Sequence, residues 1–237
     1  MLFVTLGFGL IGFLDDYIKV VMKRSMGLRA WQKMLGQFVV TAIFAYYIEK
    51  YTEINNEIII PFIGKTVVLN KWFYIVLLFF VVLGTVNGAN FTDGLDGLAS
   101  SVTALIATFF TVVAIGTGSG LAPISCAATG SLLGFLVYNV YPARVFMGDT
   151  GSLALGGFVA AIAYMLKMPL FILIVAFIYF IEVLCAFSSR YIHILFLNLL
   201  IYNFCKQLIH YRTKWNTKEH SCNSCDIASD RYRSQHP

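Results

Sequence analysis

Two aspartates stand side by side near the beginning of the chain. Asp15 and Asp16 close the first apolar run, where adjacent carboxylates lose hydration and repel each other unless a cation or water satisfies them. The pair is therefore a candidate for binding a cation. A solvated helix end is the simpler alternative.

A second polar cluster occupies residues 87–98, which read NGANFTDGLDGL. Asn87, Asn90 and Asp93 are three residues apart, so a helix would stack them on one face. The glycines that follow, beginning with Gly94, permit tight turns or close approach of a ligand. An EF-hand is disfavoured, because the alternating ligands and the terminal glutamate of a calcium loop are missing.

A third cluster surrounds Asp149, which lies between Gly148 and Gly151. A Gly-rich turn that opens a helix presents free N–H groups and the positive end of the helix dipole, both of which suit phosphate. A carboxylate beside such a turn suits Mg²⁺, which usually takes one or two carboxylates together with substrate oxygens. An ordinary capped helix start is the alternative.

The elements that must position these residues are membrane helices. The chain is 59% hydrophobic and 12% charged, whereas soluble domains carry about a quarter charged residues. We therefore predict an all-α fold, a polytopic transmembrane helical bundle with about seven spans. The apolar stretches are 35–49, 73–90, 98–116, 121–140, 152–166 and 169–187, with 191–205 as a weaker candidate.

The charges of the loops predict the orientation of the bundle. The loop from Asp15 to Lys33 is rich in Lys and Arg and belongs in the cytoplasm, whereas Glu49–Lys71 carries three glutamates and suits the outside. Counting crossings from there gives a cytoplasmic position to five aspartates, namely Asp15, Asp16, Asp93, Asp96 and Asp149. Together with the basic segment 19–33, these residues predict a site for a magnesium–pyrophosphate group beside a lipid.

The ends of the chain differ from its centre. We predict a membrane domain over 1–205 and a polar, disordered tail over 206–237. Cys222 and Cys225 in the tail lack the second ligand pair of a zinc site. Glu182, a carboxylate within an apolar run, is a functional candidate. The composition contains nothing that suggests nucleic acid as a partner.

Three ordered segments of the chain resemble the bacterial phospho-N-acetylmuramoyl-pentapeptide transferase family. They are FLDDYIK at 13–19 with Gly27, Leu28, Lys33 and Gln37 behind it, the cluster at 87–98, and PARVFMGDTGSLALGG at 142–157. The resemblance runs from about residue 5 to Glu182. The wider superfamily of polyprenyl-phosphate sugar-1-phosphate transferases shares the Asp-Asp pair and the Asp-Gly-x-Asp-Gly element.

The resemblance implies a reaction at the bacterial cytoplasmic (inner) membrane, with the active site facing the cytoplasm. Undecaprenyl phosphate would attack the sugar-side phosphate of UDP-N-acetylmuramoyl-pentapeptide. The products would be the first lipid-linked peptidoglycan precursor and UMP, with Mg²⁺ as cofactor. Membrane lipid is the other expected partner, and a homodimer is left open.

The same resemblance implies the roles of individual residues. The catalytic group would comprise Asp15, Asp16, Asp149 and Lys33. Asp149 would anchor Mg²⁺, with help from Asp93. One of Asp15 and Asp16 would act as a base, or the pair would position the lipid phosphate or the metal, since a phosphate monoester is already largely dianionic at neutral pH. Substrate would contact Lys19, Asn87, Asn90, Asp93, Gly94, Leu95, Asp96, Asn139 and Phe146. Within this set, Gly94, Leu95, Asp96 and Phe146 would form the uridine pocket.

The chain departs from the family pattern at both ends. The first apolar run, Leu2 to Leu14, reaches only ~20 Å as a helix, against a bilayer core of ~30 Å. No His triplet follows Glu182, and His193 and the three later histidines are scattered. Two alternatives therefore stand beside the main interpretation. One is a sister transferase that uses UDP-N-acetylglucosamine, and the other is an inactive truncated or frame-disrupted membrane fragment.

Overall fold

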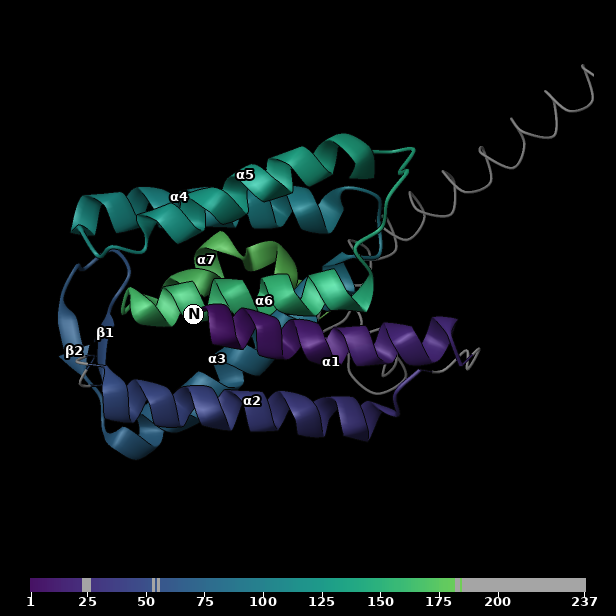
Figure 1. Cartoon of the computed structure of the whole chain (residues 1–237). Coiled ribbons are helices and arrows are strands. Elements are labelled where there is room, and N and C mark those ends of the chain that lie inside the picture. The colour runs from purple at the N-terminus through teal and green to yellow at the C-terminus, as the bar shows by residue number, and fades with distance from the viewer. Residues whose placement is uncertain (23–26, 53, 55, 182–183, 185–237) are drawn as a thin grey trace, which may run out of the picture. The chain divides into compact units, whose positions relative to one another are not determined.

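The computed structural model describes residues 1–22, 27–52, 54, 56–181 and 184. Figure 1 shows long helices that run beside one another, with a small hairpin across one end. The helices and strands are α1 (Leu2–Val20), α2 (Ala30–Tyr51), β1 (Glu57–Ile59), β2 (Thr66–Val68), α3 (Lys71–Thr92), α4 (Leu98–Thr117), α5 (Ala122–Asn139), α6 (Gly148–Met165), the 3-10 turn η1 (Pro169–Phe171) and α7 (Ile172–Val175).

The predicted all-α class is confirmed, because every long element in the described part of the chain is a helix. Two of these helices, α3 and α4, are long and apolar enough to cross a membrane. The larger number of about seven spans remains a prediction. Glu182, the candidate span 191–205 and the tail 206–237 lie outside the described residues.

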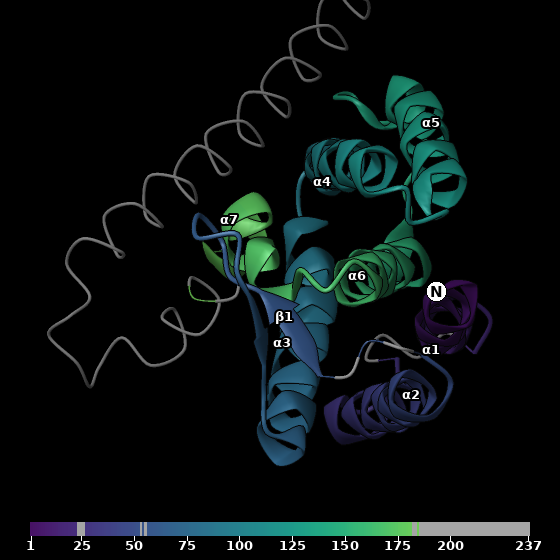
Figure 2. The same ribbon diagram turned by 90° about the vertical axis from the view of Figure 1, so that its left-hand side faces the viewer.

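Helix α6 is the central element of the bundle. Its residues from Gly156 to Tyr164 are all buried, as expected of a helix that is apolar on every side and surrounded by protein. Figure 2 looks along the helices and shows α6 among α1, α3 and α4. Residues that begin α6 are therefore held by several neighbouring helices at once.

Glycines allow α1 and α6 to approach closely in antiparallel fashion. A Cβ atom added to Gly12 would lie 2.1 Å from the carbonyl oxygen of Asp149, and one added to Gly157 would lie 2.5 Å from the Phe8 ring. Because Gly12 faces Asp149, the next turn of α1 brings Asp15 and Asp16 to the beginning of α6. This contact positions the candidate site.

The predicted external loop Glu49–Lys71 contains a hairpin. Strands β1 and β2 pair antiparallel, with Glu57 opposite Val68. The hairpin is tied to the far end of α6 twice: Ile59 donates its N–H to the carbonyl of Lys167 at 2.8 Å, and the Lys167 ammonium lies 2.6 Å from the Glu57 carboxylate. It lies across the end of the bundle opposite the C-terminal end of α1 (Figure 1).

The predicted apolar stretch 169–187 does not begin as one continuous helix. Lys167 adopts φ 59° after the end of α6, and Pro169 then opens the short turn η1, which leads into α7. Proline fits the first positions of a helix, where its missing N–H costs no hydrogen bond. The chain therefore turns sharply at this end instead of entering another straight span.

Candidate metal and phosphate site

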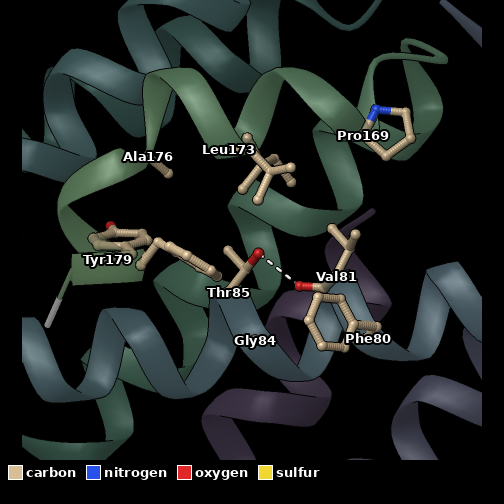
Figure 3. A pocket seen from close by; sticks show the side chains of 10 residues that line it. Phe80, Val81, Gly84, Thr85, Pro169, Leu173, Ala176 and Tyr179 are labelled. Atoms are coloured by element: carbon tan, nitrogen blue, oxygen red, sulfur yellow. Dashed lines mark hydrogen bonds between the residues drawn. The ribbon is translucent and has the colours of Figure 1, made fainter. Parts of the chain in front are cut away.

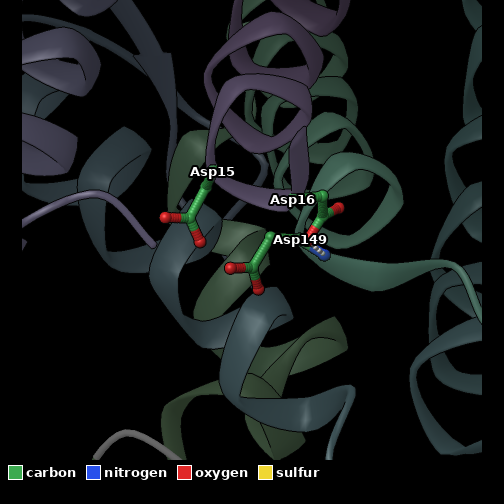
Figure 4. A group of neighbouring side chains, drawn as sticks. All are labelled: Asp15, Asp16 and Asp149. Carbon is green, nitrogen blue, oxygen red and sulfur yellow. Dashed lines mark hydrogen bonds between the residues drawn. The ribbon is translucent and has the colours of Figure 1, made fainter. Parts of the chain in front are cut away.

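Three carboxyl groups meet where α1 ends and α6 begins. Asp15 and Asp16 come from α1 and Asp149 from α6, and one ligand oxygen of each lies within 4.8 Å of the others (Figure 4). The sequence predicted that the aspartate pair ends its helix, but α1 continues to Val20. The added turn carries Lys19, which follows Asp15 by four residues and forms an ion pair with it.

Asp15 is the most deeply placed of the three, with 3% of its surface exposed. Its Oδ1 accepts the backbone N–H of Leu28 at 2.6 Å, and its Oδ2 lies 2.6 Å from the ammonium of Lys19. Gly27, with φ +57°, brings the chain so close that an added Cβ would lie 2.5 Å from the Asp15 carboxylate. Gly27 and Leu28 thus lie directly against the Asp15 carboxylate.

Asp16 has a different set of partners. One of its oxygens accepts the backbone N–H of Thr150 at 2.8 Å and the Thr150 hydroxyl at 2.6 Å, while the other lies 3.4 Å from the N–H of Asp149. In Figure 4 it points to the backbone at the start of α6. The free N–H groups that the sequence assigned to phosphate therefore face a carboxylate, and Asp16 stabilises the helix N-terminus.

Asp149 is bound from both sides. Its Oδ2 accepts hydrogen bonds from Lys19 at 2.6 Å and Lys33 at 3.2 Å, and its Oδ1 accepts one from Asn90 at 2.7 Å. Burial alone would raise the pKa of this carboxyl, but the hydrogen bonds from Lys19 and Asn90 and the charge of Lys33 lower it below the usual range of aspartate. Asp149 is therefore ionised at neutral pH.

The pKa of Lys19 shifts in the opposite direction to that of Asp149. Burial opposes its charge, but hydrogen bonds to Asp149 and Asp15 outweigh burial and raise its pKa. The ammonium lies 2.6 Å from Oδ2 of each aspartate. One protein cation thus bridges two carboxylates that are more than a hundred residues apart in the chain.

The two asparagines of the second cluster both lie on α3 but have different partners. Asn90 donates to Asp149 and to the Ser152 hydroxyl, the latter at 2.8 Å. Asn87 exchanges amide hydrogen bonds with the fully buried Gln37, at 2.8 and 3.3 Å. Asn90 therefore joins α3 to α6, and Asn87 joins α3 to α2. Their predicted contacts with substrate remain predictions.

The turn between α3 and α4 carries the remaining acidic residues. Asp93 caps the end of α3, and burial, followed by the charges of Asp149 and Asp16, raises its pKa to about 6. Asp96 accepts the backbone N–H of Ala143 at 3.1 Å. Gly94 and Leu95 lie between these aspartates, and Leu95 is exposed. The turn thus contacts the loop that leads to α6.

Phe146 lies in the loop that leads to α6, and Asn139, the last residue of α5, holds that loop in place. Asn139 is buried, accepts the Ser100 hydroxyl at 2.7 Å and donates to the carbonyl of Val145 at 2.9 Å. The next residue, Phe146, leaves 71% of its surface exposed. The Asn139 amide therefore holds the backbone that presents an open aromatic ring, and a direct contact of Asn139 with substrate is left as a prediction.

Sequence reasoning did not assign four contributors to this arrangement. Three are the hydroxyl side chains of Ser100, Thr150 and Ser152, and the last two of these lie inside the motif around Asp149, which was the available signal. The fourth is the backbone N–H of Leu28. No side-chain pattern could have indicated it, because its contact with Asp15 depends on the path of the loop.

A separate apolar pocket of about 150 Å³ lies between α3 and the segment that contains η1 and α7 (Figure 3). Its polar lining includes the hydroxyl of Thr85, which already donates to the carbonyl of Val81 at 2.7 Å. None of the ten lining residues is charged. The pocket is therefore chemically distinct from the carboxylate cluster.

Comparison with known proteins gives consistent results. A family model described as glycosyl transferase family 4 matches residues 1–167. A protein of Clostridium novyi (strain NT) named phospho-N-acetylmuramoyl-pentapeptide-transferase is 50% identical over 184 residues, which cover 77% of this chain and 56% of the relative. A protein of the same name from Acetivibrio thermocellus is 52% identical over 188 residues, with 78% and 56% coverage. The chain thus spans about half the length of the curated relatives it matches.

Proposed function

This chain belongs to glycosyl transferase family 4, and from that premise we propose that it acts in phospho-sugar transfer to a membrane lipid. The proposed reaction moves phospho-N-acetylmuramoyl-pentapeptide from UDP to undecaprenyl phosphate and releases UMP. The names of its relatives support this substrate class. We place the protein in the bacterial cytoplasmic membrane, with the carboxylate cluster facing the cytoplasm, because the basic loop after α1 lies on that side by the charge rule.

The observation that carries the proposal is the meeting of Asp15 and Asp149 around one cation. These oxygens already surround the Lys19 ammonium at 2.6 Å, so the ammonium serves as a stand-in ion that shows the cluster accepting positive charge. An all-oxygen donor set suits Mg²⁺. Asp149 and Asp15 would hold the ion, and it would neutralise the charge of the diphosphate.

Asp16 and Asp93 have supporting parts in this scheme. Both oxygens of Asp16 face backbone N–H groups of α6, so Asp16 would keep Asp149 in position instead of binding the ion through both oxygens. Asp93 is absent from the tight three-carboxylate group, but its charge interacts with Asp149 and Asp16. Its proposed help to the metal is therefore electrostatic.

The basic and aromatic residues around the cluster would bind the substrates. Lys33 and Lys19 lie against the carboxylates and would attract phosphate groups, which aligns nucleophile and leaving group. The exposed ring of Phe146 would offer a stacking surface for uracil, and Gly94, Leu95 and Asp96 would complete the uridine pocket. No base is required, because a phosphate monoester is already largely dianionic at neutral pH.

The test is UMP release by the purified chain in detergent, with undecaprenyl phosphate, UDP-N-acetylmuramoyl-pentapeptide and Mg²⁺. We expect release that stops with a chelator and returns with added Mg²⁺. A parallel reaction with UDP-N-acetylglucosamine distinguishes the sister transferase, which would use that nucleotide instead. Absence of release with either nucleotide would refute transfer by this chain and favour the inactive-fragment alternative.

A further inference from the structure

The Lys19 ammonium occupies the position at which Asp15 and Asp149 face each other. It lies 2.6 Å from the Oδ2 atom of each aspartate. Lys33 is a second and looser partner, 3.2 Å from Asp149 and 4.0 Å from Asp15. Two carboxylates this close repel each other unless positive charge lies between them. Lys19 provides that charge.

The other oxygens of the two aspartates are already bound. Oδ1 of Asp15 accepts the N–H of Leu28, and Oδ1 of Asp149 accepts the amide of Asn90. The two Oδ2 atoms that Lys19 contacts are thus the ones that a divalent cation entering between the carboxylates would need. An ammonium and a divalent metal ion beside the same pair of oxygens would repel each other strongly, so each disfavours the other there.

We propose that Lys19 is a displaceable internal cation, which holds the Asp15–Asp149 pair together until a divalent metal ion replaces it. The inference rests on the proposed function, because it requires that these aspartates bind a metal. Lys19 is suited to the role, since its side chain is 37% exposed and its ammonium is carried on a flexible four-carbon stem. It can therefore turn to solvent without any movement of α1.

The geometry also explains why Lys19 and not Lys33 is assigned this role. The Lys33 side chain is 18% exposed and lies farther from both oxygens. After exchange, Lys33 remains beside Asp149, whereas the freed Lys19 ammonium stays at the rim of the cluster. Binding of the metal would thereby free the Lys19 ammonium to contact the phosphate groups of the substrate.

The first experiment measures Mn²⁺ binding to the purified chain in detergent by electron paramagnetic resonance. Removing the competing charge with Lys19→Met should lower the Kd for Mn²⁺ by roughly tenfold or more, given the strength of close charge–charge interactions in partly buried sites. Lys19→Arg keeps the charge and should bind Mn²⁺ much as the wild type does. Lys71→Met, at the opposite end of the bundle, is the matched control and should leave the Kd unchanged.

A second measurement uses the unmodified chain and does not depend on folding of a variant. Acylation of lysines by an amine-reactive ester is followed by mass spectrometry, with and without saturating Mn²⁺. Displacement predicts that Lys19 reacts several times faster when Mn²⁺ is bound, because its ammonium no longer bridges two carboxylates. The Lys71 rate should stay the same.

The outcomes separate the two levels of the hypothesis. Equal or weaker Mn²⁺ binding by Lys19→Met, or a Lys19 acylation rate that does not respond to Mn²⁺, would overturn displacement and leave the metal site standing. Absence of Mn²⁺ binding in both the wild type and Lys19→Met would overturn the metal site itself, and displacement with it. Tighter binding in Lys19→Met that is abolished by adding Asp149→Asn would support both.

Discussion

The two ends of the helical bundle use lysine and carboxylate side chains in different ways. At the hairpin end, two lysines each pair with a single glutamate: Lys71 pairs with Glu49, and Lys167 pairs with Glu57. At the other end, Lys19 contacts two aspartates at once, and Lys33 approaches the same two. Asp16 and Asp93 add further negative charge beside this pair, so four carboxyl groups lie around the two lysine ammonium groups.

Burial sharpens this contrast. The paired side chains at the hairpin end are between 30% and 53% exposed, whereas those of Asp15 and Asp149 are 4% and 20% exposed. Exposed pairs contribute little to stability, and a buried excess of one charge is unfavourable unless a cation satisfies it. The charges at the aspartate end therefore need a cation more than those at the hairpin end do, as the proposed metal site requires.

The largest expected effect comes from neutralising one carboxylate at the aspartate end. Asp149→Asn should reduce UMP release by at least ~10²-fold, the loss typical of removing one group that stabilises charge in a transition state. Glu57→Gln removes a carboxylate from the hairpin end and should leave the rate unchanged. Thermal unfolding of both variants checks that they are folded. Equal rates for the two variants would contradict the proposal that only the aspartate end takes part in the reaction.

The next effect concerns the contact that brings α1 to α6. Gly12→Ala should lower the free energy of unfolding by about 1–3 kcal/mol, because its methyl group would overlap the carbonyl of Asp149. Gly134→Ala is the matched control, since an added Cβ there meets no atom within 4 Å. That change should be neutral or slightly stabilising. Unfolding in denaturant, monitored by circular dichroism in detergent, gives both values.

A smaller effect is expected from the pH dependence of stability. The pKa of Asp93 is raised from 3.8 to about 6 in the folded chain, so the folded state binds this proton more readily than the unfolded state does. The free energy of unfolding should therefore fall as pH rises from about 4 to about 6. Asp93→Asn should remove this fall, measured with a chelator present. An unchanged pH profile would show that Asp93 is more hydrated than its position indicates.

The smallest effect belongs to the hairpin end. Lys167→Met breaks the ion pair with Glu57 and should cost about 0.2–1 kcal/mol, the range for partly exposed pairs. A double-mutant cycle with Glu57→Gln isolates the pairwise contribution. A coupling energy well above this range would mean that the hairpin end depends on charge as strongly as the aspartate end does.

Local patterns in the sequence predicted much of this arrangement. The apolar stretches from 35 to 166 coincide with α2 to α6, because runs of this length and composition form helices in any membrane or buried setting. The hairpin within Glu49–Lys71 went unpredicted, although β-branched residues flank Gly64 on both sides. The gap between the apolar stretches 152–166 and 169–187 coincides with the turn at Lys167. The short elements η1 and α7 within 169–187 were not predicted, because nothing in that apolar run indicates where its helix is interrupted.

The sequence by itself determined that Asp15, Asp16 and Asp149 are present beside apolar helices, together with Lys19 and Lys33. It could not assign different partners to Asp15 and Asp16, which are neighbours of the same residue type. Only the tertiary structure turned Asp15 toward Lys19 and Asp16 toward the first turn of α6. The physical reason is the close packing of α1 on α6 at glycines, a contact between segments more than a hundred residues apart that no local spacing reveals.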